Sequence, residues 1–311
     1  MTIAHWDEVE SRRPRPQGLG GAWTDLGTAS GSRDVGLNRI ELDPGEVSTP
    51  AHVHGAEEEI FFVLSGSGLS WQDGATHEIR AGDCIVHRIR AEAHTLRAGE
   101  DGLTVLAFGQ RVPVGGAHLP LVGISWLRPS WAEVGQGENP FDRDQRLEWP
   151  DPSPRPASIV NLDDVEGEYG GISKRLAHPA GAERSGLNWD ALPPNTEGAP
   201  PHCHSAEDEI FVVLDGEGSL ELWAAPKPGT VPATEPTEAH PVRRGHVISR
   251  PAGTRISHCL RAGDAGLTYL SYGTREPNDM CYYPRSNKVF LRGLGLIARL
   301  EPLDYFDGEP D

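Results

Sequence analysis

The chain has no apolar run approaching the ~20 residues that a transmembrane helix requires. Its first residues, MTIAHWDEVESRRPRP, lack the apolar core of a secretory signal peptide. Cysteine is scarce as well, and the sequence contains no CxxC pair. We therefore expect a cytoplasmic protein whose thiols are reduced and buried as small apolar side chains. These thiols are Cys84, Cys203, Cys259 and Cys281.

Positive charge is also in short supply, with 28 basic residues against 46 acidic ones and a formal net charge of -18. A field of this sign repels phosphate backbones and anionic lipid headgroups, so neither nucleic acid nor a membrane surface is expected as a partner. Glycine (37) and proline (27) are frequent, but 37% of the residues are hydrophobic. This mixture is typical of a folded, β-rich chain with many turns.

The two halves of the chain repeat each other. HVHGAEEEIFFVLSG at 52–66 matches HCHSAEDEIFVVLDG at 202–216 with an offset of 150. LRAGEDGLTVLAFG at 96–109 matches LRAGDAGLTYLSYG at 260–273 with an offset of 164. The fourteen additional residues (164 minus 150) fit best in an enlarged polar loop within 224–244.

Alternating prolines at 150–156 indicate a stiff linker between the halves. We predict an N-terminal domain at 1–140, a Pro-rich linker at 141–156 and a C-terminal domain at 157–311. The segments IFFVL (60–64) and IFVVL (210–214) are β-branched and aromatic and are soon followed by glycine, as in short strands. No long segment shows a 3.6-residue period, so the predicted fold class is all-β, with two small barrels or sandwiches.

The repeated polar residues predict two metal sites. Two histidines one residue apart lie on the same face of a strand, and the glutamate and a later histidine complete each set. Three imidazoles and one carboxylate suit a divalent transition metal such as Fe, Mn, Ni, Co, Cu or Zn, and leave positions open for a ligand. The candidate ligands are His52, His54, Glu59 and His94 in the first half, and His202, His204, Glu209 and His258 in the second.

This pattern resembles the cupin superfamily, whose motifs are G-x5-H-x-H-x(3,4)-E-x6-G and G-x5-P-x-G-x2-H-x3-N. The first motif fits from its histidines onward in both halves, and the second fits Gly245, Pro251 and Gly253 before His258. Arg88 and Arg90 stand where the first half should have proline and glycine. The resemblance spans most of both halves and implies a bicupin with two double-stranded β-helix (jelly-roll) barrels. It also implies a homodimer.

Several residues allow two interpretations. Arg88 and Arg90 would either hold an anionic substrate or lie on the surface as solvated or salt-bridged arginines, which is the commoner situation. Glu57 and Glu58 would either supply a general base or form a solvated turn, which we favour. His87 would either support the first site or occupy an ordinary strand position. Strand alternation should point Cys203 and Cys259 away from the metal, and the segments 1–10 and 280–311 should pack across to the other barrel or to a second chain.

Three functions fit this pattern. The simplest is a metal-dependent dioxygenase acting on a small oxygen-bearing organic molecule, since the resemblance implies ring-cleaving dioxygenases and oxalate-degrading enzymes. A decarboxylase, isomerase or lyase would use the ion as a Lewis acid instead. The third function is that of a non-catalytic module that binds a metal or a small ligand. Glu59 and Glu209 are the candidate catalytic residues, because a ligating carboxylate can also accept a proton.

Overall fold

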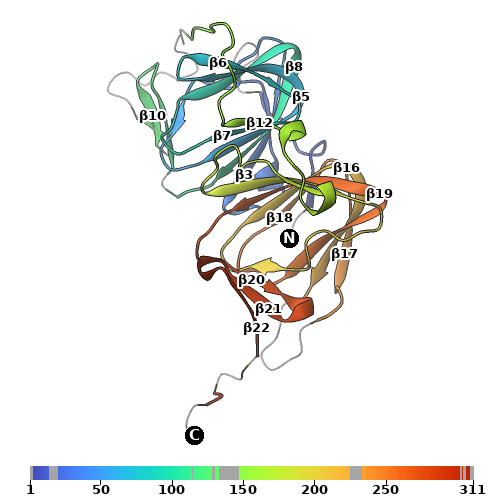
Figure 1. The fold of residues 1–311 in the computed structure, drawn as a ribbon. Coiled ribbons are helices and arrows are strands. Elements are labelled where there is room, and N and C mark those ends of the chain that lie inside the picture. Colours follow the sequence, from blue (N-terminus) through green and yellow to red (C-terminus); the bar gives the residue numbers. More distant parts are fainter. Residues whose placement is uncertain are drawn as a thin grey trace.

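The computed structural model describes residues 3–13, 20–113, 115–127, 130–132, 147–224, 233–301, 303 and 306–308. Figure 1 shows two β-barrels, the first drawn above the second. The short helix α1 (Leu26–Ala29) is the one α-helix in these ranges, alongside a few 3-10 turns. No described helix is long and apolar enough to cross a membrane. The all-β prediction is confirmed.

The first barrel consists of two antiparallel sheets. Its larger sheet has the order β12-β7-β5-β8-β3-β2, with β6 paired to β5, and its smaller sheet has the order β11-β10-β9-β4. The larger sheet contains β2 (Ala22–Asp25), β3 (Val35–Leu42), β5 (Glu59–Gln72), β6 (Ala75–Arg80), β7 (Asp83–His87), β8 (His94–Gln110) and β12 (Ile159–Asn161). The smaller contains β4 (Val53–His54), β9 (Gly116–Leu119), β10 (Ile124–Leu127) and β11 (Ser130–Ala132).

The second barrel repeats this plan. Its larger sheet has the order β1-β18-β16-β19-β14-β13, with β17 paired to β16, and its smaller sheet has the order β15-β20-β21-β22. The larger sheet contains β1 (Ile3–His5), β13 (Ser173–Arg175), β14 (Ser185–Leu192), β16 (Glu209–Trp223), β17 (Glu238–Arg243), β18 (His246–Arg250) and β19 (Ser257–Thr274). The smaller contains β15 (Cys203–His204), β20 (Met280–Tyr283), β21 (Lys288–Leu291) and β22 (Leu296–Arg299).

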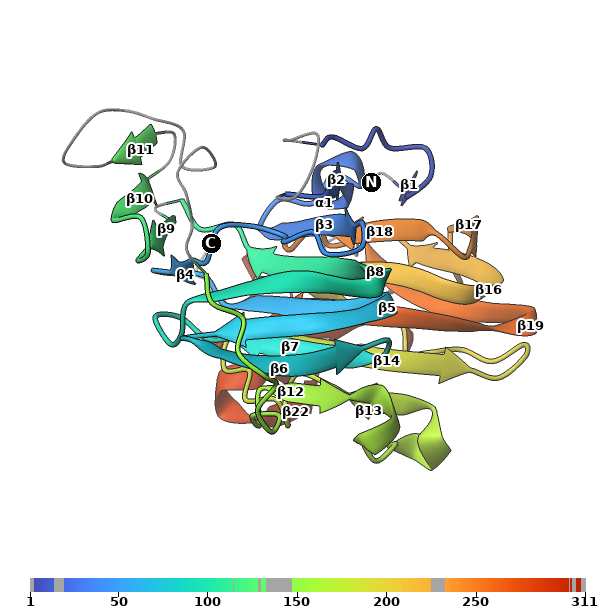
Figure 2. The same ribbon diagram turned by 90° about the horizontal axis from the view of Figure 1, so that it is seen from above.

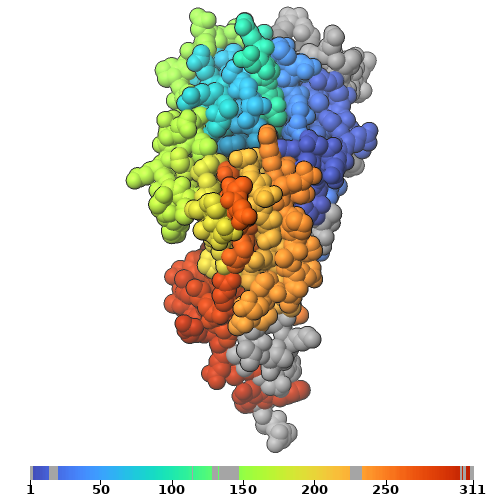
Figure 3. All heavy atoms as spheres, turned by 90° about the vertical axis from the view of Figure 1, so that its right-hand side faces the viewer, coloured from blue at the N-terminus to red at the C-terminus, as the bar shows by residue number. Residues whose placement is uncertain are grey.

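The two barrels exchange edge strands. Near the start of the chain, β1 pairs with β18 of the second barrel, and the dark blue residues lie beside orange ones in Figure 3. In return, β12 pairs with β7 of the first barrel. The packing of this segment onto the other barrel is thereby confirmed for residues 3–6, while residues 1 and 2 lie outside the described ranges. Strands β20, β21 and β22 instead extend β15 of their own barrel, so that part of the expectation for 280–311 is wrong.

The predicted domain limits stay a prediction, although strand pairing crosses them in both directions. Residues 141–146 of the predicted linker lie outside the described ranges. The enlarged loop joins β16 to β17, where the first barrel has only a two-residue turn between β5 and β6. This is the place that the change of offset indicated, and residues 225–232 of the loop also lie outside the described ranges.

The central strands β5 and β16 are buried on both faces. Phe61 and Val63 point into the core of the first barrel, whereas Ile60 and Phe62 join an apolar cluster shared by both barrels. This explains why IFFVL is a continuous apolar run and does not alternate with polar residues. The large sheets of the two barrels meet through this cluster and overlap in the view of Figure 2, and the rings of Phe108 and Tyr272 stack across their contact with centroids 5.2 Å apart.

The same alternation sends Glu58 toward the second barrel. Its side chain is buried, and its carboxylate accepts hydrogen bonds from the backbone N–H of Glu183 (2.8 Å) and Arg184 (3.2 Å) and from the Ser185 hydroxyl. The solvated turn that we predicted for Glu58 is therefore wrong. Three consecutive glutamates suggested exposure to solvent. Glu58 is buried because it lies on the same face as Ile60 and Phe62.

Asp208 is the counterpart of Glu58 in the second barrel, and its carboxylate contacts the first barrel. Its carboxylate accepts from the Asp34 N–H of the first barrel at 3.0 Å and from the Ala252 N–H at 2.6 Å. Asp34 and Arg184 are themselves equivalent positions, since they differ by the repeat offset of 150. The two carboxylates thus form a reciprocal pair of anchors between the barrels.

We expect Glu58→Ala to destabilise the protein by about 2–4 kcal/mol, because two backbone donors and the buried Ser185 hydroxyl lose their acceptor. The midpoint of chemical denaturation measures the effect. Glu100→Ala is the matched control, since Glu100 is exposed and should change stability by less than about 0.5 kcal/mol. Equal midpoints for the two variants would contradict the anchoring role of Glu58.

Candidate metal centres

The four predicted ligands of the first barrel converge inside it. His54 ends β4, Glu59 begins β5 and His94 begins β8, while His52 forms an isolated antiparallel bridge with His94. One donor atom from each of the four lies within 4.8 Å of the others. Glu59 Oε2 is the focus, at 3.0 Å from His94 Nε2, 3.4 Å from His54 Nε2 and 3.9 Å from His52 Nε2.

The electrostatics of this set suit cation binding. Burial, helped by the neighbouring imidazoles, lowers the pKa of His52 to about 3, and burial with His87 nearby lowers that of His94 to about 4. Both rings are therefore neutral at pH 7, with a lone pair available. Burial by itself would raise the pKa of Glu59, but His54 and His94 outweigh it and hold that pKa well below its usual value. A carboxylate of such low basicity is better suited to a ligand than to a proton acceptor.

The imidazoles are oriented through their other ring nitrogens. His52 Nδ1 lies 2.9 Å from the Pro50 carbonyl, and His94 Nδ1 lies 3.2 Å from the Glu92 carbonyl, so each Nε2 faces Glu59. His87 stacks on His94 with centroids 3.7 Å apart, and its Nδ1 contacts the Glu92 carboxylate at 2.7 Å. Of the two interpretations of His87, these contacts favour support of the first site over an ordinary strand position.

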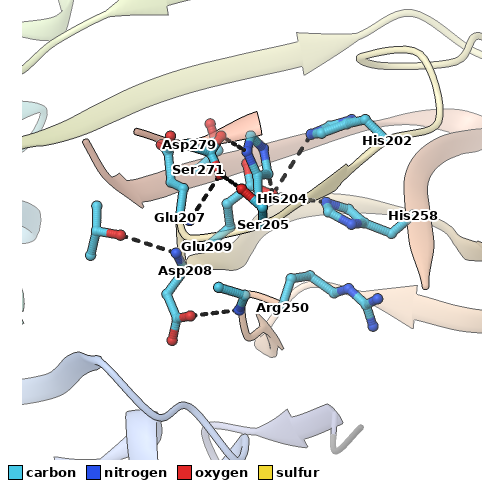
Figure 4. A network of polar contacts seen from close by, with 12 residues as sticks. His202, His204, Ser205, Glu207, Asp208, Glu209, Arg250, His258, Ser271 and Asp279 are labelled. Atoms are coloured by element: carbon cyan, nitrogen blue, oxygen red, sulfur yellow. Dashed lines mark hydrogen bonds and ion pairs between the residues drawn. The ribbon is translucent and has the colours of Figure 1, made fainter. Parts of the chain in front are cut away.

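The second barrel repeats the arrangement with a looser grouping (Figure 4). Glu209 Oε2 lies 3.0 Å from His258 Nε2, 3.6 Å from His204 Nε2 and 3.7 Å from His202 Nε2. His202, Glu209 and His258 form one group of possible metal donors, while His204 belongs to two others. Burial lowers the pKa of His258 to about 3, so its ring is also neutral.

Asp279 is a buried carboxylate beside His204 that the sequence did not reveal. Its Oδ2 lies 2.6 Å from His204 Nδ1, and its Oδ1 accepts from the N–H groups of Ala206 and Glu207. Burial alone would lower the pKa of His204, but Glu209 and Asp279 raise it to about 9. The same negative charges would stabilise a bound cation. A carboxylate behind a ligating histidine commonly fixes the ring and increases its basicity.

The entrances of the two sites differ. In the first barrel an apolar cavity of about 240 Å³ reaches His52 and His54 and is bounded by Ala117, Leu119 and Trp126. In the second barrel, strand pairing puts Cys281 where the first has Ala117, and Tyr283 where it has Leu119. All four cysteines are free and buried, as expected. Cys281 belongs to a group of possible metal donors, whereas Cys203 and Cys259 belong to none of those found among the described residues.

Arg88 and Arg90 lie in different surroundings. Arg88 forms an exposed ion pair with Glu183 at 3.2 Å, as an ordinary surface arginine does. Arg90 lines a second cavity of about 530 Å³, which shares His54, Ala117 and Trp126 with the smaller one. Its Nε donates to the Gly55 carbonyl at 3.0 Å, and no ion pair of Arg90 occurs among the described residues.

Both donor sets fit a divalent transition metal. Three imidazole nitrogens and one carboxylate oxygen are the donors that such ions take in proteins. A further observation favours a bound cation in the second barrel. His258 Nε2 and Glu209 Oε2 are buried and lie 3.0 Å apart, but outside hydrogen-bond geometry. Buried polar atoms in this state are expected where a cation supplies the missing partner.

Comparisons with known proteins agree with this description. Residues 38–108, which lie in the first barrel, match the Cupin domain family. The dimethylsulfoniopropionate lyase DddW of Ruegeria pomeroyi is 40% identical over 83 residues, which are 26% of this chain and 53% of the relative. That match therefore spans about half of the relative's length.

Solved structures of oxalate decarboxylases resemble most of this chain in fold. A Bacillus subtilis structure concerned with Mn(II) centres gives a TM-score of 0.58 at 12% identity and covers 90% of this chain and 78% of that one. A Lactobacillus farciminis structure with formate gives 0.58 at 14% identity and covers 88% and 86%. At these identities the likeness concerns the fold alone. It confirms the two jelly-roll barrels.

His52→Ala and His202→Ala should each remove about one equivalent of metal from protein that holds two ions, because each breaks one donor set. Elemental analysis of protein purified without added metal measures the loss. His240→Ala is the control, since His240 contacts Glu238 on the surface and belongs to neither set. Unchanged metal content in both of the first two variants would contradict the ligand assignment.

Asp279→Asn should weaken metal binding by the second barrel about 10- to 100-fold, the usual effect of losing a carboxylate behind a ligating histidine. The first barrel should be unaffected. Competition with a metal-binding dye separates the two affinities when each is measured with the other site disabled by His52→Ala or His202→Ala. An unchanged second affinity would show that Asp279 does not orient His204.

Proposed function

We propose that the chain is a bicupin metalloenzyme that cleaves a small organic acid as a decarboxylase or lyase, without consuming dioxygen. The observation that carries the proposal is the half-buried set of three histidines and one glutamate at the end of the apolar cavity of the first barrel. The second set, in an equivalent place, supports the assignment of the second barrel as a cupin.

The relatives favour cleavage over oxygenation. DddW is a lyase, and the oxalate decarboxylases that share the fold release carbon dioxide from a dicarboxylate, as their name states. Neither name supports the dioxygenase that we placed first from the sequence, which remains a prediction that the experiment below also tests. The proposed homodimer, the cytoplasmic location and the lack of nucleic-acid or membrane partners likewise remain predictions.

The protein's own residues would divide the work as follows. His52, His54, Glu59 and His94 would hold one ion, and the equivalent residues of the second barrel the other. A bound divalent ion would act as a Lewis acid on a substrate oxygen. Leu119 and Trp126 would exclude water from the first site. Glu59 and Glu209 remain candidates for proton transfer, although the low pKa of each carboxylate favours the ligand role.

The position of Arg90 indicates that the proposed substrate is an anion. Its backbone has a positive φ of 56°, and its N–H donates to the His54 carbonyl at 3.0 Å. Gly253 makes the same bond to His204 with a φ of 70°. Arg90 therefore occupies a position whose backbone conformation glycine adopts without strain. A left-handed arginine costs about 1–2 kcal/mol, and such strain often persists at functional sites. We infer that its guanidinium binds a carboxylate of the substrate.

The direct test is turnover of small organic acids, including oxalate and dimethylsulfoniopropionate, with strict anaerobiosis compared against air. We expect equal rates in both conditions and no oxygen uptake. Oxygen uptake in proportion to product would support the dioxygenase instead. Binding of a panel member without turnover in either condition would favour the non-catalytic module. His52→Ala and His202→Ala then show which barrel performs the reaction.

Arg90→Gly should raise KM about 10- to 100-fold, because a charge-assisted hydrogen bond of about 1.5–3 kcal/mol is lost, while kcat changes little. The variant should remain at least as stable as the parent, since glycine adopts the positive φ without strain. Arg88→Gly is the matched control and should leave KM unchanged. Equal KM values for parent and Arg90→Gly would refute the carboxylate-binding role.

A further inference from the structure

Cys281 lies directly beside the donor set of the second barrel. In the pairing of β15 with β20 it stands opposite His204, and such partners project their side chains to the same face of a sheet. A group of donor atoms within 4.8 Å of one another contains its Sγ and the ring nitrogens of His202 and His204. The residue is only 3% exposed, so the thiol faces the interior of the barrel.

A second observation points to a bound cation at the same place. His258 is also 3% exposed, and its Nδ1 has no hydrogen-bond partner among the described residues. Its Nε2 lies 3.0 Å from Glu209 Oε2 but outside hydrogen-bond geometry, whereas His94 Nε2 and Glu59 Oε2 form a hydrogen bond at the same distance in the first barrel. Buried polar atoms that face each other without forming a hydrogen bond require an explanation, and a cation bound by both atoms is one.

The first barrel offers no thiol at the equivalent position. The pairing of β4 with β9 puts Ala117 opposite His54, where the second barrel has Cys281 opposite His204. The four donors of the first barrel form one compact group, whereas those of the second are divided among several. The additional sulfur is thus found in the barrel whose nitrogen and oxygen donors are less tightly grouped.

We propose that Cys281 is a metal ligand of the second barrel and that this site prefers a sulfur-accepting ion such as Zn²⁺ or Co²⁺. The first barrel would keep a set of nitrogen and oxygen donors, which also suits Mn²⁺ or Fe²⁺, so the two barrels would hold different ions. Coordination breaks the S–H bond, forms a sulfur–metal bond and releases the proton to solvent, with no change of oxidation state. The proposal rests on the proposed metal-dependent function.

The absorption spectrum of the cobalt-substituted full-length protein tests this without relying on activity. A cysteine thiolate bound to Co²⁺ gives a strong near-ultraviolet charge-transfer band, which imidazole and carboxylate ligands do not give. We expect the band in the parent protein and in His52→Ala, in which the second donor set is intact. We expect its loss in Cys281→Ala and in Cys281→Ser, which retains the size of the side chain.

Cys203→Ala is the matched control, because Cys203 is a buried neighbour in β15 that belongs to no group of possible donors in the described residues. It should keep the band. Binding of two Co²⁺ ions by the parent without the band would overturn thiolate ligation while leaving the proposed metal-dependent function in place. Failure of the folded parent to bind Co²⁺ or any other divalent transition metal would overturn the proposed function itself. Since the parent spectrum decides between these outcomes, the test does not depend on the folding of a variant.

Discussion

Glu58 and Asp208 anchor each barrel to the other through buried carboxylates, and both candidate metal centres depend on this contact. The residue that follows each anchor, Glu59 or Glu209, begins β5 or β16, and its side chain points the opposite way and faces three histidines. In each barrel one strand, β5 or β16, therefore has two roles. Its outer face packs against the neighbouring barrel, and its inner face, toward the barrel interior, carries the candidate ligand. Figure 4 shows Asp208 extending away from the histidines that surround Glu209. Because the shared apolar cluster buries the outer faces, the position of each ligand strand is tied to the neighbouring barrel.

Much of this arrangement could be predicted because strand alternation is local. Histidines two residues apart must share a face, and their repetition in both halves identifies the donor sets from the spacing of the residues alone. The burial of Glu58 could also be predicted, since alternation groups it with Ile60 and Phe62, which are apolar in a strand with no polar face. The prediction of a solvated turn is wrong because it gave the charge of three consecutive glutamates more weight than their register.

Asp279 and Cys281 were beyond prediction for a different reason. They lie more than 70 residues from His204 and have no polar counterpart in the first half, where Ala117 occupies the place of Cys281. Only the pairing of β15 with β20 brings them to the site, and the sequence does not specify which strands pair. Arg90 represents an intermediate case. Its place in the motif was evident, but its positive φ and its cavity distinguish it from Arg88 only in three dimensions.

The repeated donor sets and the unlike entrances together describe two related centres with different chemical surroundings. An apolar cavity leads to the first, whereas a thiol and a phenol stand at the second. The central claim is that each barrel holds a divalent transition metal at its histidine–glutamate set. Anomalous diffraction from crystals of the metal-loaded protein tests it most directly. The account predicts one anomalous peak within bonding distance of each set, and the absence of a peak from both sets would contradict it.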